Sequence, residues 1–414
     1  MRMKISRRTA IQAAGLSALA SRSAEAAGSS PKTWPIVEGP DTPKLCLLIG
    51  DGGGPPAQAP QPAPPAAQAA QAAQAAQPGP PAQPAQPALL APARRGAGMV
   101  NQAASLHRIA QLGVTHIAGG GGQFPWQEEN LRAAIQRARD AGLTYYNMMI
   151  SLPANVLYGR PGRDADIEKL IASVQAAGKA GLPVIEYNFY AHRAMEGYFE
   201  ETGRAGTGIT GFDYEKMKGL PPLENEGAHT LDEMWSNITY FLKAVIPVAE
   251  KSNVRMALHP NDPPAPLSRG SQQIMGSVAG WKHLIEIVNS PSNGITFDCG
   301  VTREMGEDPV TVCRYFASRK RINHMHFRNV RVMKPYERYQ EVFIDEGVVD
   351  MFAVMRELVR NRYTGTIYPE HPRAIDYDRD RGPIRGYPGG GGYAGFVYNI
   401  GYARAMLQAA LESV

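Results

Sequence analysis

Four short stretches, RMALHP (255–260), GITFDCG (294–300), INHMHFRN (322–329) and TIYPEHP (366–372), decide how this sequence folds. Each contains an apolar run that ends at a residue able to bind a metal ion. These residues are His259, Asp298, His326 and Glu370. Imidazole nitrogens and carboxylate oxygens are common ligands of divalent cations, and a catalytic site needs a few of them close together. The four stretches therefore predict four strands that end at one metal site.

The alternation of side chains along each strand supports this prediction. Successive residues of a strand point to opposite faces. In GITFDCG, Cys299 belongs to the apolar set, so Asp298 lies on the opposite, more polar face. His259 and Glu370 also fall on the more polar faces of their strands, and His326 shares a face with a second histidine. We expect these polar faces to point into a barrel, with Asp298 rather than Cys299 as the ligand from the sixth strand.

The rest of the chain alternates between strand and helix patterns. Apolar runs predict strands at 44–49, 114–118, 144–150 and 183–189, and amphipathic segments between them predict helices. The four stretches quoted above then supply strands five to eight. A long loop rich in glycine and charge is expected at about 191–231, after the fourth strand. Eight strand–helix units predict a single (β/α)₈ TIM barrel over 44–414, which would carry its site at the C-terminal ends of the strands.

Two segments are expected to lie outside the barrel. Residues 1–27 contain the arginine pair Arg7 and Arg8, an apolar stretch and a small-residue cleavage motif, which together predict a twin-arginine export signal. We therefore expect a periplasmic protein, or a cytoplasmic one if the signal does not function. Residues 52–98 consist mainly of Ala, Gln and Pro and are expected to form a disordered insertion after the first strand.

Composition excludes several classes of protein. The net charge of +5 over 414 residues is small and is not concentrated in the structured part, so no nucleic-acid partner is expected. The three cysteines are widely spaced, which argues against a disulfide framework or a zinc ribbon. Beyond the short apolar stretch at the N-terminus, the sequence contains no segment that predicts stable membrane insertion. It leaves open whether the chain forms a homo-oligomer.

The order of several motifs resembles a known family. The runs IPVAEKSNVRMALHPNDPP (246–264), VNSPSNGIT (288–296), MHFRN (325–329), GVVDM (347–351) and YPEHP (368–372) resemble mannonate dehydratases, which are metal-dependent, xylose-isomerase-like barrels. The resemblance covers roughly residue 101 to the C-terminus. It implies dehydration of a sugar acid, D-mannonate, to 2-keto-3-deoxygluconate. The expected cofactor is a divalent metal ion, Mn²⁺ in the first place, with Fe²⁺ and Mg²⁺ as alternatives.

The resemblance also implies roles for the metal ligands. His259 and His326 match the two histidine ligands of the family, and Glu370 stands where the family usually has an aspartate. An ungapped match places Asp298 where the family has a cysteine ligand, with Cys299 one position later. The site therefore combines dehydratase-like histidines with carboxylates of the kind found in related isomerases.

Three further residues are implied to act in catalysis. Dehydration of a sugar acid requires removal of the proton next to the carboxylate and protonation of the departing hydroxyl. His371 and Tyr393 match the catalytic histidine and tyrosine of the family and would fill these roles. Arg328 follows the histidine ligand and would hold the substrate carboxylate through a forked contact.

Two other functions stay open at this point. A sugar isomerase or epimerase is favoured by Asp298 and Glu370, although the fifth strand ends in His259 and not in the glutamate that paired-glutamate epimerases use. An inactive sugar-binding barrel is the other alternative. Glu186 is expected either to touch the substrate or to pack inside the barrel, and His324 to support the ligands or to pack.

Overall fold

The computed structural model describes residues 38–52, 102–122, 124–381 and 387–414. Within them, eight parallel strands pair in the closed order β1-β12-β9-β8-β7-β4-β3-β2. All eight coincide with predicted strands, so the predicted TIM barrel is confirmed. The strands are β1 (Lys44–Leu48), β2 (His116–Gly120), β3 (Thr144–Ile150), β4 (Val184–Tyr187), β7 (Arg255–Leu258), β8 (Asn293–Asp298), β9 (Ile322–His326) and β12 (Thr366–Tyr368).

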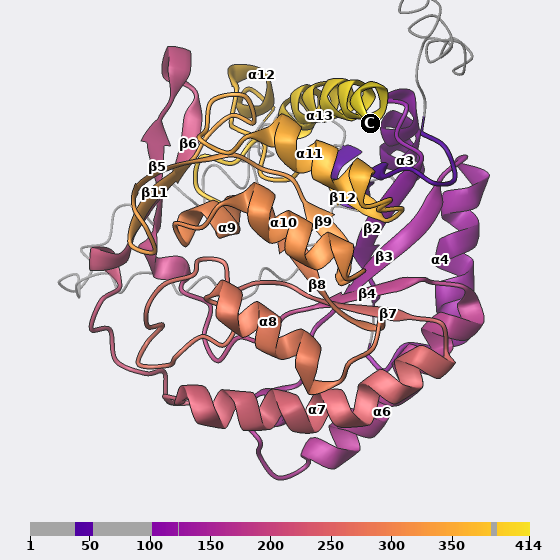
Figure 1. The fold of residues 1–414 in the computed structure, drawn as a ribbon, viewed down its shortest axis with the longest axis vertical. Coiled ribbons are helices and arrows are strands. Elements are labelled where there is room, and N and C mark those ends of the chain that lie inside the picture. Colours follow the sequence, from indigo (N-terminus) through magenta and orange to yellow (C-terminus); the bar gives the residue numbers. More distant parts are fainter. Residues whose placement is uncertain (1–37, 53–101, 123, 382–386) are drawn as a thin grey trace, which may run out of the picture.

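Helices surround the barrel and cover its outer face (Figure 1). Helix α7 begins with a capping box, in which the Thr230 side chain accepts from the Glu233 backbone N–H and the Glu233 carboxylate accepts from the Thr230 N–H. The surrounding helices are α3 (Gln102–Gln111), α4 (Glu128–Asp140), α6 (Arg163–Ala180), α7 (Leu231–Lys251), α8 (Val278–Ile287), α10 (Pro309–Ser318), α11 (Met351–Arg360) and α13 (Tyr393–Ser413). None of the helices in the described ranges is long and apolar enough to cross a membrane.

The register of the strands sets the positions of the predicted ligands. Asp298 pairs directly with His326 across β8 and β9, and His326 pairs with Tyr368 of β12. Phe297, one residue before Asp298, points outward and meets Trp281 of α8 edge-to-face. Neighbouring side chains alternate between the two faces, so Asp298 points inward, as the sequence predicts.

A second, four-stranded antiparallel sheet adds to the barrel, and we call it the accessory sheet. It consists of β5 (Tyr198–Thr202) and β6 (Gly208–Asp213), which follow β4, and of β10 (Val330–Lys334) and β11 (Arg338–Glu341), which follow β9. Figure 1 shows it to one side of the helix ring. The prediction of a loop over 191–231 is therefore wrong for β5 and β6. Both strands are short, β6 contains two glycines, and β6 is completed by β11, which is distant in sequence.

Shorter helical elements connect these units. They are η1 (Ile49–Gly52), α5 (Ala154–Leu157), η2 (Met195–Gly197), η3 (Arg204–Gly206), η4 (Tyr214–Lys216), α9 (Cys299–Glu304) and α12 (Asp376–Arg379). The predicted export signal at 1–27 lies outside the described residues. So does the predicted insertion at 52–98, apart from Gly52, which ends η1. Its place in the chain, between β1 and α3, is the one expected.

Candidate active site

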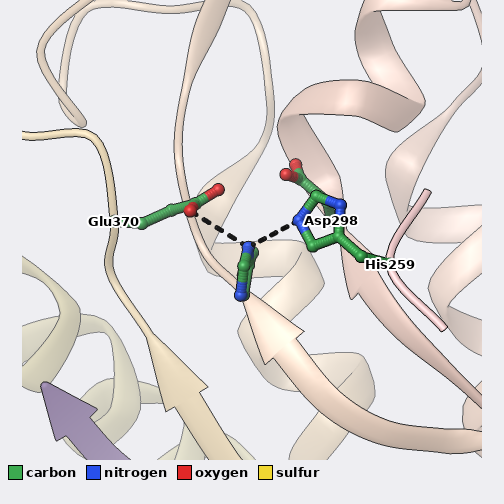
Figure 2. Close-up of side chains that lie close together, drawn as sticks. His259, Asp298 and Glu370 are labelled. Atoms are coloured by element: carbon green, nitrogen blue, oxygen red, sulfur yellow. Dashed lines mark hydrogen bonds and ion pairs between the residues drawn. The ribbon is translucent and has the colours of Figure 1, made fainter. Parts of the chain in front are cut away.

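The four predicted ligands meet at the C-terminal end of the barrel. Asp298 and His326 are the last residues of β8 and β9, His259 directly follows β7, and Glu370 lies two residues beyond β12. One ligand atom from each side chain lies within 4.8 Å of the others, and all four residues are buried. Figure 2 shows His259, Asp298 and Glu370 extending into the same space from different strands. The structure thus brings together the complete set that the sequence predicts.

Cys299 points away from this cluster. Its thiol lies 3.3 Å from the backbone carbonyl oxygen of Arg328, within the core, and burial raises the pKa of the thiol. Asp298, by contrast, is buried within the cluster. Its Oδ1 accepts a hydrogen bond from the Val301 N–H at 2.8 Å and so caps α9, and its Oδ2 lies 3.1 Å from Nε of Arg328. The geometry therefore agrees with Asp298 as the residue that the sixth strand contributes.

The hydrogen bonds of the histidines leave lone pairs that face the cluster. Nδ1 of His259 lies 2.8 Å from the carbonyl oxygen of Pro260, which can only accept, so Nδ1 carries the proton and Nε2 has the lone pair. Burial lowers the pKa of His259 to about 4, which keeps its ring neutral. This Nε2 lies 3.1 Å from Nδ1 of His326, and that Nδ1 lies 3.0 Å from Oε2 of Glu370. Nε2 of His259, Nδ1 of His326 and Oε2 of Glu370 therefore lie close together, and a cation between them would be attracted to all three.

A cation fits this arrangement. Oε1 of Glu370 is buried and accepts no hydrogen bond from the described residues, although Nε of Arg328 lies 3.2 Å away. Burial disfavours a charged His326, but Glu370 and Glu186 outweigh that effect and raise the pKa of this histidine well above its usual value. A proton on Nδ1 and a metal ion would compete for the same lone pair. The two imidazoles and two carboxylates match the ligand set that divalent metals such as Mn²⁺ or Fe²⁺ accept.

His371 stands next to the cluster, as the sequence predicts. Its backbone is left-handed, with φ of 47°, a conformation that residues other than glycine adopt rarely. Nε2 of His371 lies 3.4 Å from Oε2 of Glu370 and Nδ1 lies 2.8 Å from Oε2 of Glu341. The ring of His371 therefore lies between the cluster of four candidate ligands and the accessory sheet.

The tyrosine beside His371 is Tyr387 and not the predicted Tyr393. The rings of Tyr387 and His371 have centroids 4.5 Å apart, and the Tyr387 hydroxyl lies 3.3 Å from Oδ2 of Asp262. Tyr393 begins α13, and its hydroxyl donates to the carbonyl oxygen of Arg108 in α3 at 3.4 Å. The helical register of α13 directs Tyr393 towards α3, whereas Tyr387 lies in the loop before it. The stretch GYPGGGGY contains both tyrosines, and no pattern within it favours Tyr387 over Tyr393 as the neighbour of His371.

Comparison with known proteins agrees with this geometry. The sequence model of the family described as D-mannonate dehydratase (UxuA) matches residues 95–413. The chain belongs to the D-mannonate dehydratase family. It is 30% identical over 285 residues to the mannonate dehydratase of Streptococcus suis (strain 05ZYH33), which covers 62% of this chain and 77% of that protein. Identity to the mannonate dehydratase of Enterococcus faecalis (strain ATCC 700802 / V583) is 28% over 324 residues, covering 68% and 89%.

Solved structures show the same relationship. The crystal structure of mannonate dehydratase from Streptococcus suis serotype 2 is similar with a TM-score of 0.68 at 27% identity, covering 74% of this chain and 91% of that chain. A D-psicose 3-epimerase from Clostridium cellulolyticum H10, solved with D-tagatose, has a TM-score of 0.50 at 12% identity, covering 75% and 93%. The epimerase shares the fold alone.

Below the ligands, this member of the dehydratase family has a layer of buried polar residues inside the barrel. Oε1 of Glu186 lies 3.4 Å from Nε2 of His326, and the same carboxylate accepts from Asn147 at 2.8 Å and from Thr296 at 2.9 Å. His324 belongs to this layer, with Nδ1 2.8 Å from Oγ1 of Thr366, and burial lowers its pKa to about 4. Of the two expectations for Glu186, packing inside the barrel is therefore the one that the geometry matches.

Arg328 lies beside the cluster, but its guanidinium faces protein carboxylates. The side chain is 2% exposed, and its nitrogens lie between 2.6 and 3.6 Å from five carboxylate groups. These belong to Asp262, Asp298, Glu304, Glu341 and Glu370. A forked contact with a substrate carboxylate, as expected from the sequence, would have to displace them. In this arrangement, Arg328 instead offsets part of the negative charge around the ligands.

Arg193 is a cation near the site that the sequence analysis did not assign. It follows β4, its side chain is 39% exposed, and it lies 3.6 Å from Oδ2 of Asp262. Nε donates to the carbonyl oxygen of Asp262 at 3.0 Å, and Nη2 donates to the Tyr387 hydroxyl. The side chain of Arg193 is thus partly exposed and lies beside Tyr387.

Proposed function

We propose that this protein is a hydro-lyase that dehydrates D-mannonate to 2-keto-3-deoxygluconate. The observation that carries the proposal is the buried cluster of His259, Asp298, His326 and Glu370 with His371 beside it, in a chain of the D-mannonate dehydratase family. Two histidines and two carboxylates suit metal-assisted chemistry on an oxygen-rich substrate.

The four clustered residues would hold the divalent ion. When bound, such an ion supplies Lewis-acid stabilisation of the negative charge that develops on the substrate as the proton beside its carboxylate is removed. Mn²⁺ is the proposed native ion, with Fe²⁺ and Mg²⁺ as alternatives, because the cluster offers nitrogen and oxygen ligands and the neighbouring thiol of Cys299 faces away. Metal analysis of the protein as isolated tests this assignment.

Two protein groups would handle the protons of the reaction. The C2 proton of mannonate must leave, and the C3 hydroxyl must gain a proton to depart as water. The resulting enol then takes a proton at C3 to give the 2-keto acid. We assign these transfers to Nε2 of His371 and the hydroxyl of Tyr387, because their rings lie against each other with centroids 4.5 Å apart. Tyr393 is the alternative that the family resemblance implies, and its hydroxyl faces α3.

The substrate carboxylate needs a cationic partner, for which we propose Arg193 rather than Arg328. Arg193 is 39% exposed and lies beside Tyr387, whereas Arg328 is 2% exposed and surrounded by carboxylates. A guanidinium with an exposed edge can form a forked contact with a carboxylate without breaking buried ion pairs.

Reaction in D₂O tests the function. Purified protein with Mn²⁺ and D-mannonate is expected to give 2-keto-3-deoxygluconate with deuterium at C3, followed by NMR and by a colorimetric assay for the 2-keto acid. If mannonate is unchanged but keto-sugars exchange their C2 or C3 protons, the protein is an isomerase or epimerase. Metal and sugar binding with neither reaction would identify an inactive sugar-binding barrel. Either result contradicts the proposal.

The cellular location of the enzyme is a separate proposal. Arg7 and Arg8 with the apolar stretch after them support export through the twin-arginine route, and so a periplasmic enzyme. Replacing both arginines by lysine is expected to retain the full-length protein in the cytoplasm, as followed by cell fractionation. Equal export of the variant and the natural sequence would contradict this proposal.

A further inference from the structure

The accessory sheet delivers one carboxylate to the active site. Glu341 is the last residue of β11, is 1% exposed, and pairs in register with Thr210 of β6. Its Oε2 lies 2.8 Å from Nδ1 of His371. The loop after barrel strand β12 therefore supplies the histidine, and a strand that is additional to the barrel supplies its acidic partner.

Arg373 holds both partners in place. Its Nη2 donates to Oε2 of Glu341 at 3.1 Å and to the backbone carbonyl oxygen of His371 at 2.7 Å. Its Nη1 donates to the backbone carbonyl oxygen of Glu341 at 3.0 Å and to Oγ1 of Thr210 at 2.7 Å. Arg373 is itself 1% exposed. A buried cation that binds the carboxylate and both backbones restricts the orientation of Glu341 and the left-handed backbone of His371.

This contact fixes which nitrogen of His371 carries a proton. An ionised carboxylate can only accept a hydrogen bond, so Nδ1 of His371 must be the donor, whether the ring is neutral or charged. Nε2 is then the nitrogen that faces the metal cluster, where it lies 3.4 Å from Oε2 of Glu370. A free imidazole could present either nitrogen as the donor, and Glu341 removes that choice.

We propose that Glu341 is the positioning residue of this active site, holding His371 in the tautomer and orientation in which Nε2 meets the substrate. The proposal rests on the function proposed above, because it assigns the proton transfer to Nε2 of His371. It also gives the accessory sheet a role in catalysis. Glu341 itself lies behind His371 and would not touch the reacting atoms.

Glu341→Gln tests the proposal with little change in shape. The amide can turn its N–H₂ towards Nδ1 and so permit the tautomer with the proton on Nε2. We expect kcat to fall at least about 100-fold, as for other residues that orient a catalytic or metal-bound histidine. KM for D-mannonate and the metal content should stay within about two-fold of the natural protein. Glu337→Gln, in the same hairpin, is the matched control and should leave kcat unchanged.

A double variant separates positioning from general damage to the fold. His371→Asn removes the group through which Glu341 would act, so Glu341→Gln should cause no further loss of kcat when it is added to His371→Asn. Independent, multiplicative losses would overturn the proposal, as would a kcat for Glu341→Gln within two-fold of the natural enzyme.

Histidine NMR supplies a readout that does not depend on the substrate. In ¹⁵N-histidine-labelled, metal-free protein, the His371 signals are identified by their absence in His371→Asn. We expect a protonated Nδ1 in the natural protein and a changed proton distribution in Glu341→Gln. An unchanged distribution would overturn the proposal. A natural protein that has the Nδ1 proton but does not dehydrate mannonate would instead contradict only the proposed function.

Discussion

Nε2 of His326 lies 3.4 Å from Oε1 of Glu186, while Nδ1 on the other side of the ring faces Glu370 at 3.0 Å. Both carboxylates can only accept, so each ring nitrogen can carry a proton. If a metal ion displaces the proton on Nδ1, the contact with Glu186 keeps the other proton on Nε2. A carboxylate behind a ligating histidine fixes its tautomer and raises its basicity. Glu186 would therefore support His326 as a metal ligand from inside the barrel.

Glu186→Gln is expected to weaken metal binding by about 10- to 100-fold, because the amide no longer fixes the Nε2 proton of His326. The amide oxygen can still accept from Asn147, and the Thr296 hydroxyl, which can also accept, can bond to the amide N–H₂, so the interior packing should be retained. Titration of Mn²⁺ into metal-free protein by calorimetry measures the effect. Glu168→Gln, at an exposed position on α6, is the control. Equal affinities in the two variants would show that Glu186 only packs the barrel.

Asp298→Ala should abolish retention of the metal, whereas Cys299→Ser should not. Asp298 lies in the cluster, and the Cys299 thiol faces the backbone of Arg328 at 3.3 Å. The metal content after gel filtration, measured by mass spectrometry, distinguishes the two variants. The reverse result would mean that the sixth strand presents its thiol to the metal and that the alternation argument is wrong.

Tyr387→Phe should lower kcat by at least about 100-fold, since loss of a group that transfers a proton in the transition state typically costs this much. Tyr393→Phe should leave kcat within about two-fold, because its hydroxyl only bonds to the carbonyl oxygen of Arg108. Steady-state kinetics with D-mannonate compares them directly. A large loss in Tyr393→Phe with none in Tyr387→Phe would restore the assignment that the family resemblance implies.

The two arginines should respond differently to truncation. Arg328→Met leaves five buried carboxylates without their common cation and should destabilise the fold by about 3–5 kcal/mol, as loss of one partner of a buried ion pair usually does. Arg193→Met should leave the stability nearly unchanged and should raise KM for mannonate. Denaturant unfolding and steady-state kinetics measure the two effects. A raised KM in a stable Arg328→Met variant would show that Arg328 binds the substrate carboxylate.

The barrel and its four clustered residues could be predicted because both follow from local patterns. Four of the strand patterns lead directly to a metal-competent residue, and alternation along β8 distinguishes Asp298 from Cys299 without any knowledge of the fold. The accessory sheet could not be predicted in this way, since Thr210 pairs with Glu341 across more than a hundred residues of chain. The alternation of side chains along short strands does not show which distant strand each one pairs with.

The residues around the four candidate ligands were also hard to predict, because their positions depend on tertiary packing. Tyr387 reaches His371 through a loop whose path depends on tertiary packing, and a helical register turns Tyr393 towards α3. The carboxylates around Arg328 come from separate elements, Glu304 on α9 and Glu341 on β11 among them. Their shared interaction with one guanidinium follows from the fold and from no spacing in the sequence.

The most direct test is a titration of Mn²⁺ into metal-free protein, following bound metal and formation of 2-keto-3-deoxygluconate from D-mannonate in the same samples. We predict one ion per chain, with dehydration rising in proportion to the ion bound, and neither binding nor product with Asp298→Ala. Dehydration at full rate without metal, or one tightly bound ion without any 2-keto acid, would contradict the assignment of this cluster as the metal centre of a mannonate dehydratase.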